Sequence, residues 1–320
     1  MRTIALEEHY ATQALLDAPT ENAQYDLRAF PALAARLCDL DSGRIAEMDA
    51  AGVDLAVLSL TSPGVEQLDA AEAIAIARDA NDRLAAAVQR HPTRLAGFAA
   101  LPTAAPDAAA DELERAVRDL GFRGALINGH TRGRYLDGQG FWPILERAEA
   151  LGVPLYLHPT PPPRTVVEVT YAGLPPQIAA LLATGAWGWH VDTALHVLRL
   201  ILGGAFDRYP RLQLVVGHLG ETLPFMLPRF DLTLPTRATG LERPVGAYLR
   251  ENVHYTFSGF NWTPAFLDLL LQVGVDRIMF STDHPYASMA EARGFLDRLA
   301  VSPADRERIA HGNAEALLRL

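Results

Sequence analysis

The chain of 320 residues contains no lysine, and its only cysteine is Cys38. Without lysine, it cannot form the carbamylated lysine bridge with which some enzymes hold two metal ions. A lone cysteine likewise excludes an intrachain disulfide and a metal site made of thiolates. The scarcity of thiols fits a reducing compartment, so we expect a cytoplasmic protein.

The chain also lacks a cluster of basic side chains, and acidic residues outnumber basic ones by 38 to 28. We therefore expect no nucleic-acid partner, because binding to a phosphate backbone requires concentrated positive charge. No apolar run is long enough to cross a bilayer, and the first residues lack the basic region, apolar run and cleavage site of a signal peptide. No membrane association is expected.

In other respects the composition of the chain is ordinary for a soluble enzyme, with 49% apolar and 21% charged residues. From residue 41 onward, short apolar runs that end in polar residues alternate with longer segments of helical spacing, which is typical of repeated βα units. The eight candidate strands are residues 4–6, 55–59, 95–99, 124–127, 154–157, 213–216, 253–257 and 277–280. The candidate helices are residues 44–51, 71–90, 108–120, 141–151, 191–202, 221–230, 264–273, 290–299 and 303–318.

This alternation predicts an α/β fold, a (β/α)8 TIM-type barrel that forms one domain over residues 1–320. A doubly wound open sheet is the alternative, but no glycine-rich phosphate loop follows the first strand. Two connections, residues 10–40 and 159–190, are too long for simple turns. The second is a long insertion after strand five, and we expect such loops to be lids or subunit contacts.

The first candidate strand runs directly into Glu7, Glu8 and His9. Because side chains alternate along a strand, Glu7 and His9 should share one face. A carboxylate and an imidazole in that arrangement suit Zn(II) or Mn(II). The alternative is a solvated Glu-His tip on an edge strand, and this stretch alone does not distinguish the two.

Polar residues follow several other candidate strands. In a parallel barrel, all strand ends open on one face, so these side chains should converge on one site. The residues are Ser59, Asn128, His158, His218 and Asp283. Each has a simpler explanation when taken singly, such as a hydrogen-bonded strand end for His158 or a helix N-cap for Asp283. Together on one face, they predict a functional site.

Four motifs carry a resemblance to a known family. They are Glu7-x-His9, the sequence Tyr-Leu-His-Pro at residues 156–159, Gly-His-Leu-Gly-Glu at 217–221, and Phe-Ser-Thr-Asp-x-Pro at 280–285. In these motifs the chain resembles the branch of the amidohydrolase superfamily that contains the metal-dependent decarboxylases of hydroxybenzoates and of aminocarboxymuconate semialdehyde. It is most similar to the γ-resorcylate (2,6-dihydroxybenzoate) and 2,3-dihydroxybenzoate enzymes. The resemblance covers essentially the whole chain.

The resemblance implies one divalent metal ion per subunit, Zn2+ or Mn2+, with no organic cofactor. The implied ligands are Glu7, His9, His158 and Asp283. It also implies that His218 and Glu221 form a catalytic pair beside the metal, and that Arg229 belongs to the active site. We expect Arg229 and Asn128 to contact the substrate.

The implied activity is that of a carboxy-lyase in aromatic catabolism, the non-oxidative decarboxylation of an ortho-hydroxybenzoate such as 2,6- or 2,3-dihydroxybenzoate or salicylate. Direct loss of CO2 would leave an in-plane aryl anion that the π system cannot delocalise. The ring carbon must therefore be protonated first, and we expect Asp283 to supply that proton. His218, fixed by Glu221, should orient or deprotonate the hydroxyl.

Two other functions remain possible on the same barrel. The metal would make hydroxide for hydrolysis of a lactone or amide, or it would only stabilise a non-catalytic scaffold. Two positions depart from the family pattern, His284 and Asp192, and we expect them to affect the pocket wall or a subunit contact. Trp187 and Trp189 in the insertion predict a homo-oligomer, a dimer or tetramer.

Overall fold

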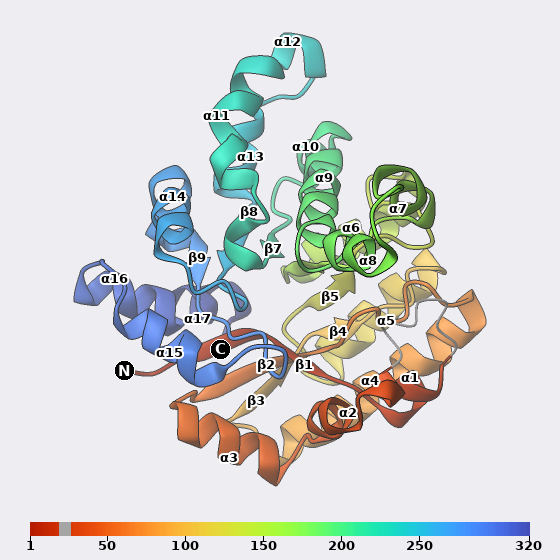
Figure 1. The fold of residues 1–320 in the computed structure, drawn as a ribbon, viewed down its shortest axis with the longest axis vertical. Helices are drawn as coiled ribbons and strands as arrows, with labels where there is room; N and C mark the ends of the chain where they lie inside the picture. The colour runs from red at the N-terminus through yellow and green to blue at the C-terminus, as the bar shows by residue number, and fades with distance from the viewer. Residues whose placement is uncertain (19–26) are drawn as a thin grey trace.

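The computed structural model describes residues 1–18 and 27–320, and at its centre parallel strands are surrounded by helices (Figure 1). All eight candidate strands are present. They are β1 (Ile4–Tyr10), β2 (Leu55–Leu60), β3 (Leu95–Gly97) with β4 (Ala99–Ala100), β5 (Ala125–Asn128), β6 (Leu155–His158), β7 (Leu214–Val216), β8 (Val253–Thr256) and β9 (Ile278–Met279). The third candidate strand is divided into β3 and β4, and every pairing is parallel.

Hydrogen bonds link these strands in chain order, as β1-β2-β3 and β4-β5-β6-β7-β8-β9. Phe98, between β3 and β4, donates its N–H to Leu58 O at 2.9 Å and so joins the two groups. At the other end, Leu6 N–H donates to Phe280 O at 3.2 Å, and Leu6 forms a parallel bridge with Ser281. The first and last strands therefore meet, which confirms the predicted barrel and excludes the open sheet.

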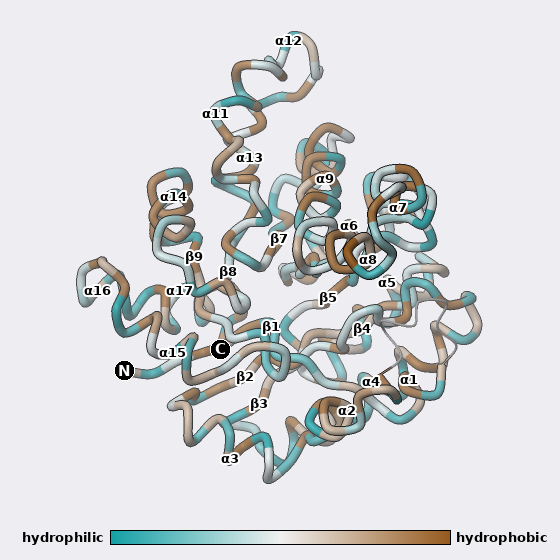
Figure 2. Tube along the Cα trace, viewed as in Figure 1, coloured by the Kyte–Doolittle hydropathy of each residue, from teal (hydrophilic) through white to brown (hydrophobic). Residues whose placement is uncertain are grey.

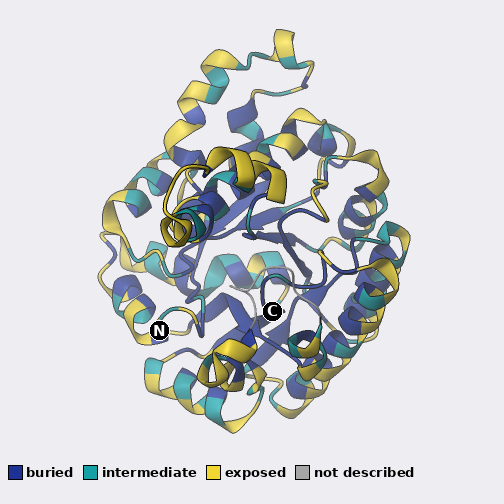
Figure 3. Ribbon diagram, turned by 45° about the vertical axis from the view of Figure 1, so that its right-hand side comes forward, coloured by how far each residue is buried: buried dark blue, intermediate teal, exposed yellow. Residues whose placement is uncertain are grey.

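The helices pack around the strands, with buried inner faces and exposed outer faces (Figure 3). They are α1 (Gln13–Asp17), α2 (Pro31–Cys38), α3 (Ser42–Ala51), α4 (Ala70–Arg90), α5 (Pro106–Arg118), α6 (Trp142–Leu151), α7 (Arg164–Thr170), α8 (Pro176–Ala183), α9 (Gly188–Leu202), α10 (Ala205–Arg208), α11 (Leu223–Thr233), α12 (Thr236–Thr239), α13 (Val245–Glu251), α14 (Thr263–Val273), α15 (Met289–Asp297), α16 (Pro303–Glu307) and α17 (Asn313–Leu318). At the top of Figure 1, α11, α12 and α13 extend beyond the barrel.

Three helix predictions need correction. The two long connections contain short helices, α1 and α2 in the first and α7 and α8 in the second; residues 19–26 of the first connection lie outside the described residues. The helix predicted at 221–230 begins only at Leu223, because Glu221 and Thr222 have left-handed φ angles of 54° and 70°. The helix predicted at 303–318 is divided by a π-helical turn, Arg308–Gly312.

Apolar side chains form two layers, one inside the strands and one between strands and helices. Ile4 and Leu6 of β1 pack inside with Val57 and Phe98, whereas Ala5 packs outside. In Figure 2 many stretches of the trace are brown and therefore apolar, for example along α8 and α9. None of the helices in the described ranges is both long and apolar enough to span a membrane.

Candidate functional site

The end of β1 contains a bulge at Glu7. The pairing of β1 with β2 shifts by one residue between Ala5 and Glu8, and Glu7 takes a φ of 64°. Strict alternation would place Glu7 on the opposite side from Leu6, which packs inside the barrel. The bulge lets Glu7 follow Leu6 to the inner side, where His9 also lies.

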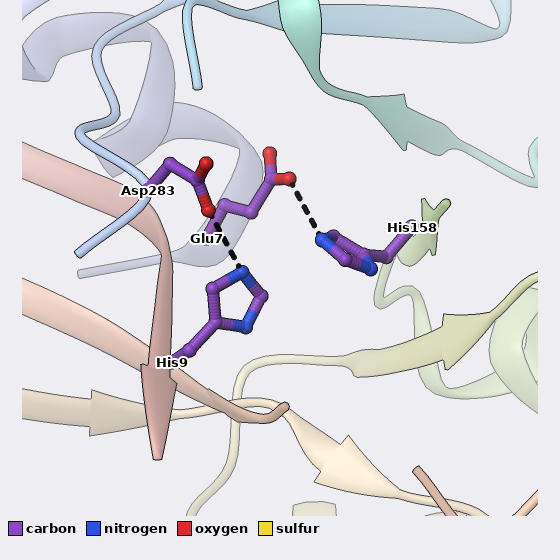
Figure 4. A group of neighbouring side chains, drawn as sticks. All are labelled: Glu7, His9, His158 and Asp283. Carbon is purple, nitrogen blue, oxygen red and sulfur yellow. Dashed lines mark ion pairs between the residues drawn. The ribbon is translucent and has the colours of Figure 1, made fainter. Parts of the chain in front are cut away.

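The structure brings together the four side chains expected to bind metal (Figure 4). Glu7, His9, His158 and Asp283 each offer a ligand atom, and these atoms lie within 4.8 Å of one another. His9 Nε2 is 3.1 Å from Asp283 Oδ1, and His158 Nε2 is 3.3 Å from Glu7 Oε1. The ligands come from β1, from β6 and from the segment after β9, so the barrel itself sets their spacing.

Burial controls the charge of these four groups. It raises the pKa of Glu7 to about 7 and that of Asp283 to about 7, because the charged carboxylates lose their hydration. It lowers the pKa of His9 to about 3 and that of His158 well below its ordinary value. Both imidazoles are thus neutral, with a lone pair available for a cation.

These residues fit a divalent metal ion. Glu7 Oε1 and His9 Nε2 are buried and have no hydrogen-bond partner within the described part of the chain. Such atoms are costly to bury unless something binds them. Two neutral imidazoles and two carboxylates form a donor set that Zn2+ and Mn2+ accept, and the cation would offset the cost of burying two negative charges.

The second oxygen of Glu7 is fixed by hydroxyl groups. Tyr156 and Ser258 donate hydrogen bonds to Glu7 Oε2, and Thr256 lies 3.4 Å from the same oxygen. A Cβ atom at Gly217 would come within 2.5 Å of it, so only glycine leaves room for the carboxylate there. Glu7 therefore presents Oε1 to the ligand group in one orientation.

A second group lies beside the first and contains the predicted catalytic pair. His218 Nδ1 is 2.6 Å from Glu221 Oε1, and His218 Nε2 is 3.9 Å from Glu7 Oε1. The other oxygen of Glu221 is 2.5 Å from His190 Nδ1, and His190 Nε2 is 2.9 Å from the carbonyl of Gly185. Glu221 is thus held between two imidazoles, and that of His218 approaches Glu7 of the first group.

Charge stabilises this second group. Burial lowers the pKa of His218, but the carboxylates of Glu221 and Glu7 raise it to about 10. Burial raises the pKa of Glu221, but His218 and the hydrogen bond with His190 lower it to about 2. The pair is therefore an imidazolium and a carboxylate, and His218 holds a proton firmly.

Strained backbone accompanies these functional groups. Besides Glu7, the residues His218, Glu221 and Asp283 have left-handed φ angles of 50°, 54° and 64°. Each such residue costs on the order of 1 kcal/mol and persists only where its surroundings impose it. The strained positions coincide with the side chains that meet at the barrel mouth.

Of the two residues predicted to contact the substrate, one lies at the strand ends and the other does not. Asn128 is buried at the end of β5, in register with His158, and its Oδ1 has no partner among the described residues. Its N–H donates to Glu66 Oε1 at 2.8 Å. Arg229, in contrast, is exposed on α11, and no hydrogen bond or ion pair of its side chain with the site is found in the described ranges. The structure brings Asn128 to the strand ends but not Arg229.

The two departures from the family pattern lie away from the ligand atoms. The His284 imidazole lies near Glu47, with 3.5 Å between Nδ1 and Oε2, on the side of α3. Asp192 lies in α9 and accepts a hydrogen bond of 2.6 Å from Tyr135.

Three residues of the site were not predicted from the sequence. Tyr156 and Ser258 orient Glu7, and His190 orients Glu221. Tyr156 had a usable signal, because it precedes His158 by two residues in one strand and must face the same side. His190 and Ser258 had none, since their contacts depend on segments far apart in sequence.

Comparison with known proteins is consistent with this geometry. The family model described as amidohydrolase matches residues 31–320. The γ-resorcylate decarboxylase of Polaromonas sp. is 40% identical over 99% of this chain and 98% of its own length. A crystal structure of 2,6-dihydroxybenzoate decarboxylase with bound 2,6-dihydroxybenzoate has a TM-score of 0.90 at 39% identity, covering 100% of both chains. A dihydroxybenzoic acid decarboxylase from Polaromonas sp., solved with manganese and the inhibitor 2-nitroresorcinol, has a TM-score of 0.91 at 38% identity, covering 100% of this chain and 97% of its own.

Proposed function

The chain belongs to the amidohydrolase family, and from this premise we propose that it is a carboxy-lyase acting in aromatic catabolism. Its reaction is the non-oxidative decarboxylation of an ortho-hydroxybenzoate, with 2,6-dihydroxybenzoate as the first candidate substrate. The observation that carries the proposal is the Glu7, His9, His158 and Asp283 group, in a chain 39% identical to an enzyme solved with that substrate.

We assign the four-residue group to one divalent metal ion per subunit. Manganese in the Polaromonas structure favours Mn2+ over Zn2+. A cation held there would act as a Lewis acid for negatively charged oxygens. Glu7 would keep its orientation through Tyr156 and Ser258 while Oε1 binds the cation.

Asp283 is the proposed proton donor to the ring. Asp283 is the least buried of the four residues, so its carboxyl group can exchange between binding the cation and holding a proton, and burial raises its pKa above the ordinary value. The proton goes to the carbon that carries the carboxylate, and electron density from the ionised ortho hydroxyl supports this step. The C–C bond then breaks, CO2 leaves, and its electron pair restores the aromatic ring.

His218 is proposed to orient the ortho oxygen of the substrate by donating the Nε2–H of its imidazolium to it. Glu221 receives the Nδ1–H of His218, so Nε2 is the atom available to the substrate. The raised pKa of His218 keeps the imidazolium charged, and its positive charge would stabilise the ionised ortho oxygen during the reaction. We assign substrate binding to Asn128, whose Oδ1 is unpartnered in the described part of the chain. Arg229 is exposed on α11, so the substrate contact expected of it is not assigned within one subunit.

The ortho hydroxyl should decide which benzoates react. We expect salicylate or a 2,6- or 2,3-dihydroxybenzoate to lose CO2 without oxygen or an organic cofactor. We expect 3- and 4-hydroxybenzoate to be inert, because neither has an oxygen beside the carboxylate that could bind the cation as a chelate, and 3-hydroxybenzoate also lacks the electron push to the carboxyl-bearing carbon. The measurement is loss of ultraviolet absorbance together with CO2 release. In heavy water the product should carry one deuterium on the ring carbon that carried the carboxylate. Equal turnover of 4-hydroxybenzoate, or lactone hydrolysis with no decarboxylation, would favour the hydrolase alternative.

We also propose that residues 1–320 form one catalytic domain that assembles as a cytoplasmic homodimer or homotetramer through the insertion. The insertion exposes large apolar side chains on α7, on α8 and at Trp187. The exposed fractions are 79% for Val169, 57% for Leu181, 51% for Ile178 and 49% for Trp187. Several large apolar side chains exposed on one insertion are typical of a protein interface.

Light scattering tests the assembly. A monomer has a mass of 34.8 kDa, and we expect at least twice that value at micromolar concentration. Changing Val169 and Leu181 together to glutamate should shift the protein toward the monomer, because the charges would be buried in the interface. Ile74→Glu is the matched control on α4, at 39% exposure. A monomeric wild type, or assembly unaffected by the double change, contradicts the proposal.

A further inference from the structure

Glu8 lies between two metal ligands in sequence but belongs to neither group described above. Its side chain is fully buried at 0% exposure. Oε1 accepts the Thr282 N–H at 2.8 Å, and Oε2 accepts the Thr282 hydroxyl at 2.5 Å and the His284 N–H at 3.3 Å. The carboxylate therefore binds the residues on both sides of Asp283.

Other contacts reinforce the same connection between the first and last strands. His9 N–H donates to His284 O at 2.7 Å, and His9 O accepts from the buried guanidinium of Arg44 at 2.7 Å. After Asp283 the chain turns, and the N–H groups of Tyr286 and Ala287 both donate to Asp283 O at 2.9 Å. Asp283 itself keeps a left-handed φ of 64°, which needs support from its surroundings.

From this geometry we infer that Glu8 is a positioning residue, whose carboxylate holds residues 282–284 against β1 and thereby aims the Asp283 side chain at His9 Nε2. The inference rests on the function proposed above for Asp283. Two of the three hydrogen bonds are short, at 2.8 and 2.5 Å, and all three converge on one side chain, so Glu8 can hold the strained backbone in place. Without it, Asp283 is free to relax to an ordinary conformation and leave the ligand group.

The first test is Glu8→Gln, which keeps the size of the side chain but places an amide N–H against donors. We expect kcat on 2,6-dihydroxybenzoate to fall about 30-fold with KM changed less than about threefold, as for other groups that orient ligands. Mn2+ affinity, followed by electron paramagnetic resonance of the free ion, should weaken about tenfold. A crystal structure of the variant should show Asp283 displaced from His9. Unchanged kcat and Mn2+ affinity overturn the inference.

A second pair of variants covers the case in which Glu8→Gln does not fold. Thr282→Val removes only the hydroxyl that binds Glu8 Oε2, and Thr282→Ser restores it. We expect the valine variant to lose kcat and Mn2+ affinity and the serine variant to recover both. Equal behaviour of the two variants overturns the inference.

The matched control is Glu112→Gln, at a buried carboxylate on the outside of the barrel. Glu112 accepts a hydrogen bond of 2.7 Å from Asn81 and pairs with Arg115. Glu112→Gln should lose stability but keep kcat and Mn2+ affinity. If it lost kcat and Mn2+ affinity as much as Glu8→Gln does, the Glu8 effect would be general destabilisation, and the inference would be overturned. If the wild type decarboxylates nothing, the proposed function fails, while the Mn2+ and crystallographic measurements still decide the role of Glu8.

Discussion

Asp283→Asn should lower kcat by about 10³-fold, because the amide oxygen can still bind a cation but the amide cannot deliver a proton to the ring. The side chain keeps its size, so its contact with His9 Nε2, 3.1 Å from Oδ1, should survive. The measurement is decarboxylation of 2,6-dihydroxybenzoate by protein with a verified metal content.

Asp192→Asn is the control for this prediction. Asp192 is also a buried carboxyl group, and burial raises its pKa to about 6, but its hydrogen-bond partner is Tyr135, which belongs to neither group of the site. That variant should keep its turnover. Substantial activity of Asp283→Asn with metal bound would assign the proton donor to another residue, with His218 as the first candidate.

His158→Ala should remove the metal ion while the barrel stays folded. The imidazole occupies the end of β6 and is 3.3 Å from Glu7 Oε1, so its loss takes one neutral ligand from a group of four. We expect metal affinity to fall by more than the roughly 10–100-fold typical of residues that only orient ligands. Elemental analysis measures the metal, and circular dichroism checks the fold.

His254→Ala is the matched control for metal binding. His254 lies near the start of β8 and contacts Gln213 and Arg277, which precede β7 and β9, so it is at the opposite end of the barrel from the ligands. It should retain the metal. Full metal occupancy in His158→Ala would remove His158 from the ligand set.

The sequence predicted the strands well because each is a short apolar run whose signal is local. Conversely, α7 and α8 were not predicted, because prolines around them are typical of a loop. Their apolar residues are mostly exposed, so they do not show the periodic pattern of a helix with one buried face. Glu221 was assigned to a helix although its left-handed φ of 54° places it before α11. That conformation depends on its contacts with His190 and His218, which no local pattern reveals.

In the candidate site, too, some residues could be predicted from local sequence and others could not. Glu7, His9, His158 and Asp283 stand at strand ends, so chain order and the barrel geometry suffice to bring them together. The groups that orient them make contacts across long sequence separations. Ser258, for example, reaches Glu7 from the segment after β8, and only the folded barrel places it there.

The bulge in β1 separates two tasks within a single strand. Residues before Glu7 follow one alternation and fill the barrel with Ile4 and Leu6, while residues after it follow a second alternation that serves the ligands. A change of side chain in the first half is therefore a matter of packing, and one in the second half a matter of chemistry. Deleting Glu8 would remove the bulge, merge the two alternations and turn the carboxylate of Glu7 out of the barrel while Leu6 stays inside, so we expect this strand to tolerate substitutions far better than changes in length.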